Sequence, residues 1–136
     1  MSLIKIDQAL AVNPASSRIW YERGCTLADA GNYREALVNF NQALTLQPSD
    51  ARLWVFQSVM LIHLERYLEA LESCDRALAI NPKDAEALLF RGVAFQRLGR
   101  YRMAYASYEN ALGRGQKASR GRWQNFKEIW SSLTAN

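Results

Sequence analysis

Residues 20–48 read WYERGCTLADAGNYREALVNFNQALTLQP, and this stretch determines the fold because the chain repeats its pattern. The pattern returns at residues 54–82 and 88–116, an offset of 34 residues without a gap. Aligned columns hold a bulky apolar residue, a small residue, a tyrosine and an alanine: Trp20/Trp54/Leu88, Gly24/Ser58/Gly92, Tyr33/Tyr67/Tyr101 and Ala36/Ala70/Ala104. A fixed period of this length is the signature of a repeat architecture.

Each copy of the repeat has helical apolar spacing, near 3.6, in two segments separated by a short turn. Gly31 and Gly99 stand in that turn, where glycine commonly ends a helix. The second segment ends at an X-Pro pair, because proline lacks the N–H and restricts the residue before it; these pairs are Asn13-Pro14, Gln47-Pro48 and Asn81-Pro82. Two residues later come candidate N-caps, Ser16, Asp50 and Asp84. The sequence therefore predicts helices over residues 16–29, 32–46, 50–63, 66–80, 84–97 and 100–113.

The pattern Trp20…Gly24…Tyr33…Ala36…Phe40…Ala43…Pro48 resembles the tetratricopeptide repeat (TPR), a 34-residue helix–turn–helix unit. The resemblance implies an all-α fold, a right-handed superhelical solenoid of TPR repeats. We expect the second helix of a partial repeat at residues 1–14, full repeats at 17–50, 51–84 and 85–118, and a C-terminal capping helix at 119–136. Three polar residues depart from the pattern, which usually has leucine at their position: Arg23, Gln57 and Arg91.

The two ends of the array differ. Residues 119–133 place Trp123, Phe126, Trp130 and Leu133 on one helical face, which is typical of a helix that covers the last repeat. At the other end, a second helix without its first is expected to leave Leu3, Ile4, Ile6 and Leu10 partly unshielded. We therefore expect a fragment of a longer array. Self-assembly, or stacking on further repeats, through this uncovered helix is an alternative function.

Composition and motifs argue against catalysis, metal binding and membrane insertion. Of 136 residues, 49% are hydrophobic and 22% charged, which indicates one globular domain, and charges interrupt every apolar run. A single histidine, the absence of a glycine-rich phosphate loop and the lack of zinc-ligand spacing predict no enzyme activity, cofactor or metal. Two scattered cysteines, Cys25 and Cys74, fit a cytoplasmic location.

The TPR resemblance implies that the first helix of each repeat lines a concave groove. The lining residues expected from the helical period are Arg18, Tyr21, Glu22 and Cys25, then Arg52, Val55, Phe56, Val59 and His63, then Glu86, Leu89, Phe90, Val93 and Arg97. Contiguous apolar side chains on a surface often mark an interface. The alternative is that superhelix curvature, or the capping helix, buries them.

We expect a partner protein in this groove. Chaperone-binding members of the family hold a C-terminal carboxylate with lysine, asparagine and arginine side chains. The matching positions here are Tyr21, Cys25, Phe56, Glu86 and Phe90, and none has the required donor. A peptide or helix with apolar anchors and acidic flanks suits the groove better, because arginines stand at its rim: Arg18, Arg52 and Arg97.

Nucleic-acid binding is a third and weaker hypothesis. Residues 97–136 carry a net charge of +6, whereas the first 96 residues sum to −2. However, Trp123 and Trp130 fall on the apolar face of the predicted capping helix and away from its arginines, which favours packing over stacking on bases.

Overall fold

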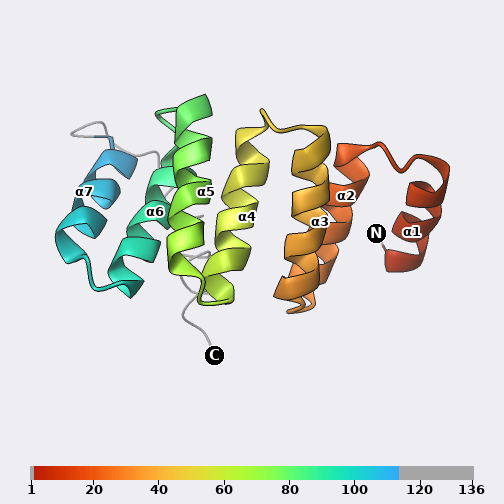
Figure 1. The fold of residues 1–136 in the computed structure, drawn as a ribbon, viewed down its shortest axis with the longest axis horizontal. Coiled ribbons are helices and arrows are strands. Elements are labelled where there is room, and N and C mark those ends of the chain that lie inside the picture. The colour runs from red at the N-terminus through yellow and green to blue at the C-terminus, as the bar shows by residue number, and fades with distance from the viewer. Residues whose placement is uncertain (1, 114–136) are drawn as a thin grey trace.

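The computed structural model describes residues 2–113, and within that range every regular element is a helix. The helices are α1 (Leu3–Val12), α2 (Ser17–Asp29), α3 (Tyr33–Leu46), α4 (Ala51–His63), α5 (Tyr67–Ile80), α6 (Ala85–Arg97) and α7 (Tyr101–Ala111). They stand side by side in an elongated row with α1 and α7 at its two ends (Figure 1). The expected all-α solenoid of helix–turn–helix units is confirmed, and the predicted helix limits agree with the observed ones to within two residues. The capping helix predicted at 119–136 lies outside the described residues.

Each first helix begins at its predicted cap. Ser16 accepts a hydrogen bond from the backbone N–H of Ile19 at 3.4 Å, and Asp84 accepts from both Glu86 and Ala87 at 3.1 Å. Asp50 accepts from Arg52 at 3.0 Å. These contacts satisfy amide groups that the helix itself leaves without partners.

In the first two repeats, a tryptophan connects the first helix to the loop before it. The indole Nε1 of Trp20 donates to the carbonyl of Pro14 at 2.8 Å, and Trp54 donates to Pro48 at the same distance. Leu88 replaces the tryptophan in the third repeat and is buried, so that repeat relies on apolar packing at this position.

The turn inside each repeat has the same backbone geometry three times. Gly31 and Gly99 have φ values of 82° and 77°, and Glu65 occupies the equivalent position with φ 60°. The backbone N–H of the next residue donates to the carbonyl five residues earlier, at 2.8 Å in every repeat. This is the long hydrogen bond of a Schellman motif. The left-handed conformation is unfavourable for a residue with a Cβ, so the second repeat has a strained turn.

The small-residue column is matched to the side chain that faces it. A Cβ on Gly24 would lie 2.7 Å from a ring carbon of Phe40, and one on Gly92 would lie 2.4 Å from the ring of Tyr108. The second repeat combines Ser58 with the small Cys74, and both side chains are fully buried. Close helix pairing is therefore reached by two combinations, glycine with an aromatic ring and serine with cysteine.

The N-terminal helix is better packed than its sequence suggested. Ile6, expected to be partly unshielded, is 0% exposed, because α1 packs on α2 and turns this side chain into the interface. Ile4 is 72% exposed, but its equivalent Val38 is also 58% exposed in a repeat that has both helices, so this position faces solvent whether or not the first helix is present. Leu3 and Leu10 are half-buried. The exposed apolar surface of α1 is thus smaller than predicted.

Candidate protein-binding groove

The predicted groove residues belong to α2, α4 and α6, and the structure separates them by exposure. The arginines and Glu86 are exposed: Arg18, Arg52, Arg97 and Glu86. A second group is half-buried: Tyr21, Glu22, Cys25, Phe56, Val59 and His63. A third group is buried: Val55, Leu89, Phe90 and Val93.

The buried group corrects the expectation of an apolar lining that is accessible along the whole groove. Phe90 is 2% exposed, Val93 1% and Val55 3%, and all three belong to the main hydrophobic core. Leu89 is 9% exposed. α6 packs against α4 as well as against α5 and α7, so its side chains are covered from three sides. Of the predicted apolar residues, those on α2 and part of α4 remain accessible.

The accessible part centres on a group of aromatic rings. The rings of Tyr21 and Phe56 meet edge to face with centroids 5.3 Å apart, and the buried ring of Phe40 lies 5.4 Å below Phe56. The guanidinium of Arg52 lies over the Tyr21 ring, 4.6 Å from its centroid, and 3.7 Å from the carboxylate of Asp50. The result is a preorganised apolar surface with a cation at its edge.

Three titratable side chains among the predicted groove residues lie in environments that favour their neutral forms. Burial raises the pKa of the Cys25 thiol, so the nucleophilic thiolate is disfavoured. Burial lowers the pKa of His63 from its ordinary value of 6.5, and its imidazole stacks on Tyr33 with centroids 3.9 Å apart. Burial also raises the pKa of Tyr21 to about 12. None of these environments activates a group for catalysis near neutral pH.

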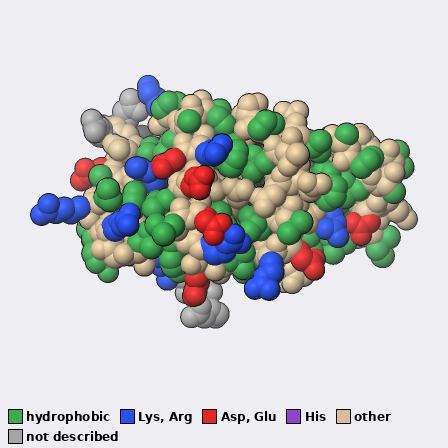
Figure 2. Space-filling view, viewed as in Figure 1, with side chains coloured by type: hydrophobic (Ala, Val, Ile, Leu, Met, Phe, Trp, Pro, Cys, Tyr) green, Lys and Arg blue, Asp and Glu red, His purple; other side chains and the backbone are tan. Residues whose placement is uncertain are grey.

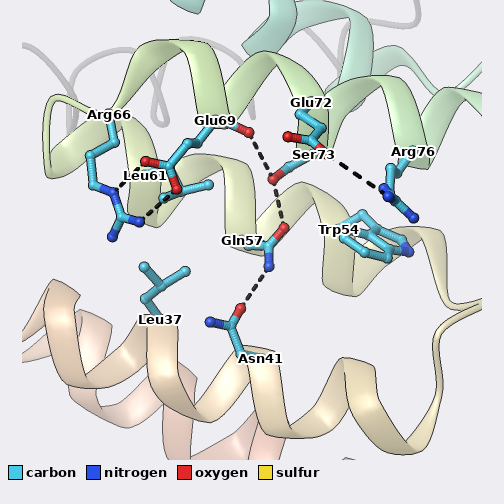
Figure 3. A pocket seen from close by; sticks show the side chains of 10 residues that line it. All are labelled: Leu37, Asn41, Trp54, Gln57, Leu61, Arg66, Glu69, Glu72, Ser73 and Arg76. Atoms are coloured by element: carbon cyan, nitrogen blue, oxygen red, sulfur yellow. Dashed lines mark hydrogen bonds and ion pairs between the residues drawn. The ribbon is translucent and has the colours of Figure 1, made fainter.

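A second feature, which the sequence did not lead us to predict as a site, is a cleft between α3 and α5 with α4 as its floor (Figure 3). Its volume is about 360 Å³. Arg66 and Glu69 form a two-bond ion pair at its rim, with distances of 2.9 and 2.6 Å. Over α5, acidic and basic side chains lie next to one another (Figure 2). Arg76 and Glu72 form a second pair at 3.8 Å, so the two arginines of the cleft are balanced by two glutamates and its lining carries no net charge.

The cleft contains part of a hydrogen-bond network that recurs in each repeat. We call this network the polar ladder, and each first-helix residue with its two partners is one step of it. In its floor, the Gln57 amide donates to Asn41 at 2.6 Å and accepts from the Ser73 hydroxyl at 2.6 Å. The other repeats place an arginine at the same step: Arg23 donates to Asp7 and Asn39, and Arg91 donates to Asp75 and Ser107. In every one of these hydrogen bonds, the two residues are 16 positions apart in the sequence. The residues that depart from the usual leucine therefore link each first helix to the second helices on both sides.

Residues 2–113 bring together no cluster of three or more potential metal ligands. In the same range, no helix has both the length and the apolar character needed to cross a bilayer.

Comparisons with known proteins agree with this architecture. Two family models, both described as tetratricopeptide repeat, match residues 21–85 and 85–114. No curated protein matches the chain. Among solved structures, a crystal structure of MamA superposes with a TM-score of 0.77 at 16% identity, covering 94% of this chain and 80% of that one. Another MamA structure, from MSR-1, has 19% identity and a TM-score of 0.69 over 78% of this chain, which spans about three fifths (61%) of it.

Two isolated TPR domains are also similar. The Arabidopsis OM64 TPR domain has a TM-score of 0.72 at 23% identity, covering 87% of this chain and 93% of that domain. The first TPR of Spaghetti (RPAP3), solved with the HSP90 peptide SRMEEVD, has a TM-score of 0.71 at 21% identity, covering 88% and 94%. At these identities the likeness shows a common fold. The repeated columns, the helix pairs and the matching family models together establish that the chain belongs to the tetratricopeptide repeat family.

Proposed function

We propose that this domain is a non-catalytic scaffold that binds a segment of another protein on the accessible part of its concave face, formed by α2 and α4. TPR membership supports a protein–protein interaction role. The observation that carries the proposal is the half-exposed pair of Tyr21 and Phe56, whose rings are 5.3 Å apart with Arg52 beside them. Rigid aromatic side chains next to arginine are the residue types that dominate binding energy at interfaces.

The chemistry of the surface indicates the kind of segment it accepts. Similar structures include the RPAP3 domain with an HSP90 peptide, but this chain has Tyr21, Cys25 and Phe56 at three positions where carboxylate-binding members carry donors. We therefore propose apolar anchors on the Tyr21–Phe56 pair and an acidic flank paired with Arg52, whose side chain is 60% exposed. A free C-terminal carboxylate is not required.

Selection from a displayed library of random peptides, followed by fluorescence anisotropy with the selected peptides, tests this proposal. We expect sequences that combine apolar and acidic residues. Arg52→Glu should weaken their binding by about tenfold, because an interfacial ion pair becomes a repulsion. Leu68→Glu is the matched control, since Leu68 lies on α5 outside the groove and is 62% exposed.

The outcomes separate the possible binding surfaces. Equal binding by the wild type and Arg52→Glu, together with loss in Leu68→Glu, would move the site to the opposite face. Circular dichroism must show that each variant keeps its helices. Phe90→Glu is unsuitable as a groove variant, because a charge at a side chain that is 2% exposed would disrupt the core.

Self-association through α1 is a second candidate function, favoured by the exposure of Ile4 (72%) and Val12 (86%). Ile4→Glu tests it, whereas substitution of the buried Ile6 would also disturb the packing of α1 on α2. We also keep a cytoplasmic location as a proposal, because both cysteines, Cys25 and Cys74, are free.

A further inference from the structure

The last described helix, α7, carries an exposed apolar stripe. The stripe consists of Tyr101, Tyr105 and Leu112, whose spacing of four and seven residues places them on one side of the helix. Tyr108 borders the stripe but is half-buried, because its ring packs against Gly92 of α6 and its hydroxyl donates to Gln96 at 2.8 Å. Tyr105 is 65% exposed, Tyr101 56% and Leu112 37%. At the positions equivalent to Tyr105 in α3 and α5, Leu37 and Leu71 are only 7% and 8% exposed, because the next repeat covers them.

Two opposite charges border this stripe on the same side. Arg102 and Glu109 are both exposed and are seven residues apart, so they are about two helical turns apart along one edge. Glu109 occupies the position that Asp75 holds one repeat earlier. Asp75 accepts a hydrogen bond at 3.0 Å from Arg91 of the following helix. The edge of the stripe is therefore a position at which this fold receives an arginine from a neighbouring helix.

We propose that the α7 stripe binds the α7 stripe of a second copy of this chain, with the two helices antiparallel across a twofold axis. In this arrangement the Tyr105 rings of the two copies lie next to each other near the axis, and Tyr101 faces Leu112 of the second copy. Arg102 pairs with Glu109 of the second copy, and the symmetry repeats that ion pair. A twofold interface uses the same patch on both subunits, so the patch must complement itself.

The arrangement of charges selects a second copy as the occupant. An antiparallel twofold reverses the order of residues in the partner helix, so an edge with arginine near one end and glutamate near the other meets its own complement. A stripe with two like charges would repel itself in the same arrangement. The contact leaves Tyr21, Phe56 and Arg52 free, because they lie on α2 and α4, and it is thus independent of the proposed peptide binding.

Sedimentation velocity on the full chain over a range of concentrations tests this interface. The wild type should shift from the 15.5 kDa of one chain toward twice that mass as concentration rises. Arg102→Glu gives two glutamates on each edge, and Glu109→Arg gives two arginines. Each variant alone should dimerise with a Kd raised about tenfold or more, since both ion pairs become repulsions.

Mixing the two variants gives the decisive result. An equimolar mixture of Arg102→Glu and Glu109→Arg places glutamates opposite arginines, and it should form a heterodimer as stable as the wild-type dimer. Tyr105→Glu should abolish the dimer, whereas Leu68→Glu, with a similar exposure of 62% in the wild-type residue, should leave it unchanged. A wild type that stays monomeric at every concentration, as residues 119–133 covering the stripe would make it, overturns the proposal. So does a dimer that neither single variant weakens, or that only Ile4→Glu disrupts.

Discussion

The contact between Gly24 and Phe40 leads to a quantitative prediction for Gly24→Ala. The new Cβ would lie 2.7, 2.9 and 3.0 Å from three carbons of the Phe40 ring, whereas carbon atoms pack best at about 3.5–4.0 Å. The ring must therefore move by about 1 Å. Phe40 is 0% exposed and is held between Tyr21 and Phe56, so it has no space to enter.

The expected magnitude combines two opposing terms. Overpacking of a close-packed core costs about 1–3 kcal/mol, and a 2.7 Å contact with a fully buried ring places this site in the upper part of that range, about 2–3 kcal/mol. Alanine is a better helix former than glycine by about 1 kcal/mol, which offsets part of that cost. We expect Gly24→Ala to lower the free energy of unfolding by about 1–2 kcal/mol, measured by urea denaturation followed by circular dichroism. Gly92→Ala is the internal comparison and should cost less, because Tyr108 is half-buried whereas Phe40 is fully buried.

A double variant tests the steric origin of the effect. Gly24→Ala/Phe40→Leu removes the ring edge that the new Cβ would meet, so its loss of stability should be smaller than the sum of the two single losses by at least about 0.5 kcal/mol. The native pair of Ser58 with Cys74 is the same compensation in the second repeat. A Gly24→Ala protein as stable as the wild type, or strict additivity in the double variant, would refute the reasoning.

Glu65→Gly should raise the free energy of unfolding by about 0.5–1 kcal/mol, because glycine adopts the φ of 60° without strain; a lower urea midpoint would contradict the strained-turn interpretation. The folded state holds the pKa of His63 below 6.5, so the unfolded state binds its proton first as pH falls. Stability should therefore be full above pH 6.5 and decline below it until the folded-state pKa is passed, and His63→Gln should remove this part of the pH dependence in urea titrations. In the ladder, Gln57→Arg combined with Asn41→Asp should restore the arginine–aspartate pair of the other repeats, with a coupling energy below about 1 kcal/mol at this exposed site. A coupling of zero in a double-mutant cycle would mean that the polar step does not link the helices.

The polar ladder could be predicted from the sequence only in part. Arg23, Gln57 and Arg91 were recognisable as departures from the usual leucine, since they share one column of the 34-residue period. Their partners were not, because a contact across 16 residues depends on which neighbouring helix each side chain reaches. Only the packed helices show that Gln57 bridges Asn41 and Ser73.

The binding groove stays a prediction, and the exposure of its expected residues was in part wrong. The helical period correctly assigned Tyr21 and Phe56 to neighbouring positions on successive first helices, and the structure brings their rings together. The same period placed Phe90 and Val93 on that face, yet both are buried. A period describes the direction of a side chain on one helix, whereas its exposure depends on the distance and angle to the next helix.

The sequence by itself determined the fold class, the number and limits of the helices in residues 2–113, the caps and the turns, because these depend on local spacing, backbone restrictions and short-range hydrogen bonds. Tertiary structure decided which apolar columns reach solvent and which pairs of side chains meet. In the packed structure Ile6 and Phe90 are buried, whereas Tyr105 is exposed to solvent. The physical reason is that burial is a property of two packed surfaces, and a single chain segment specifies only one of them.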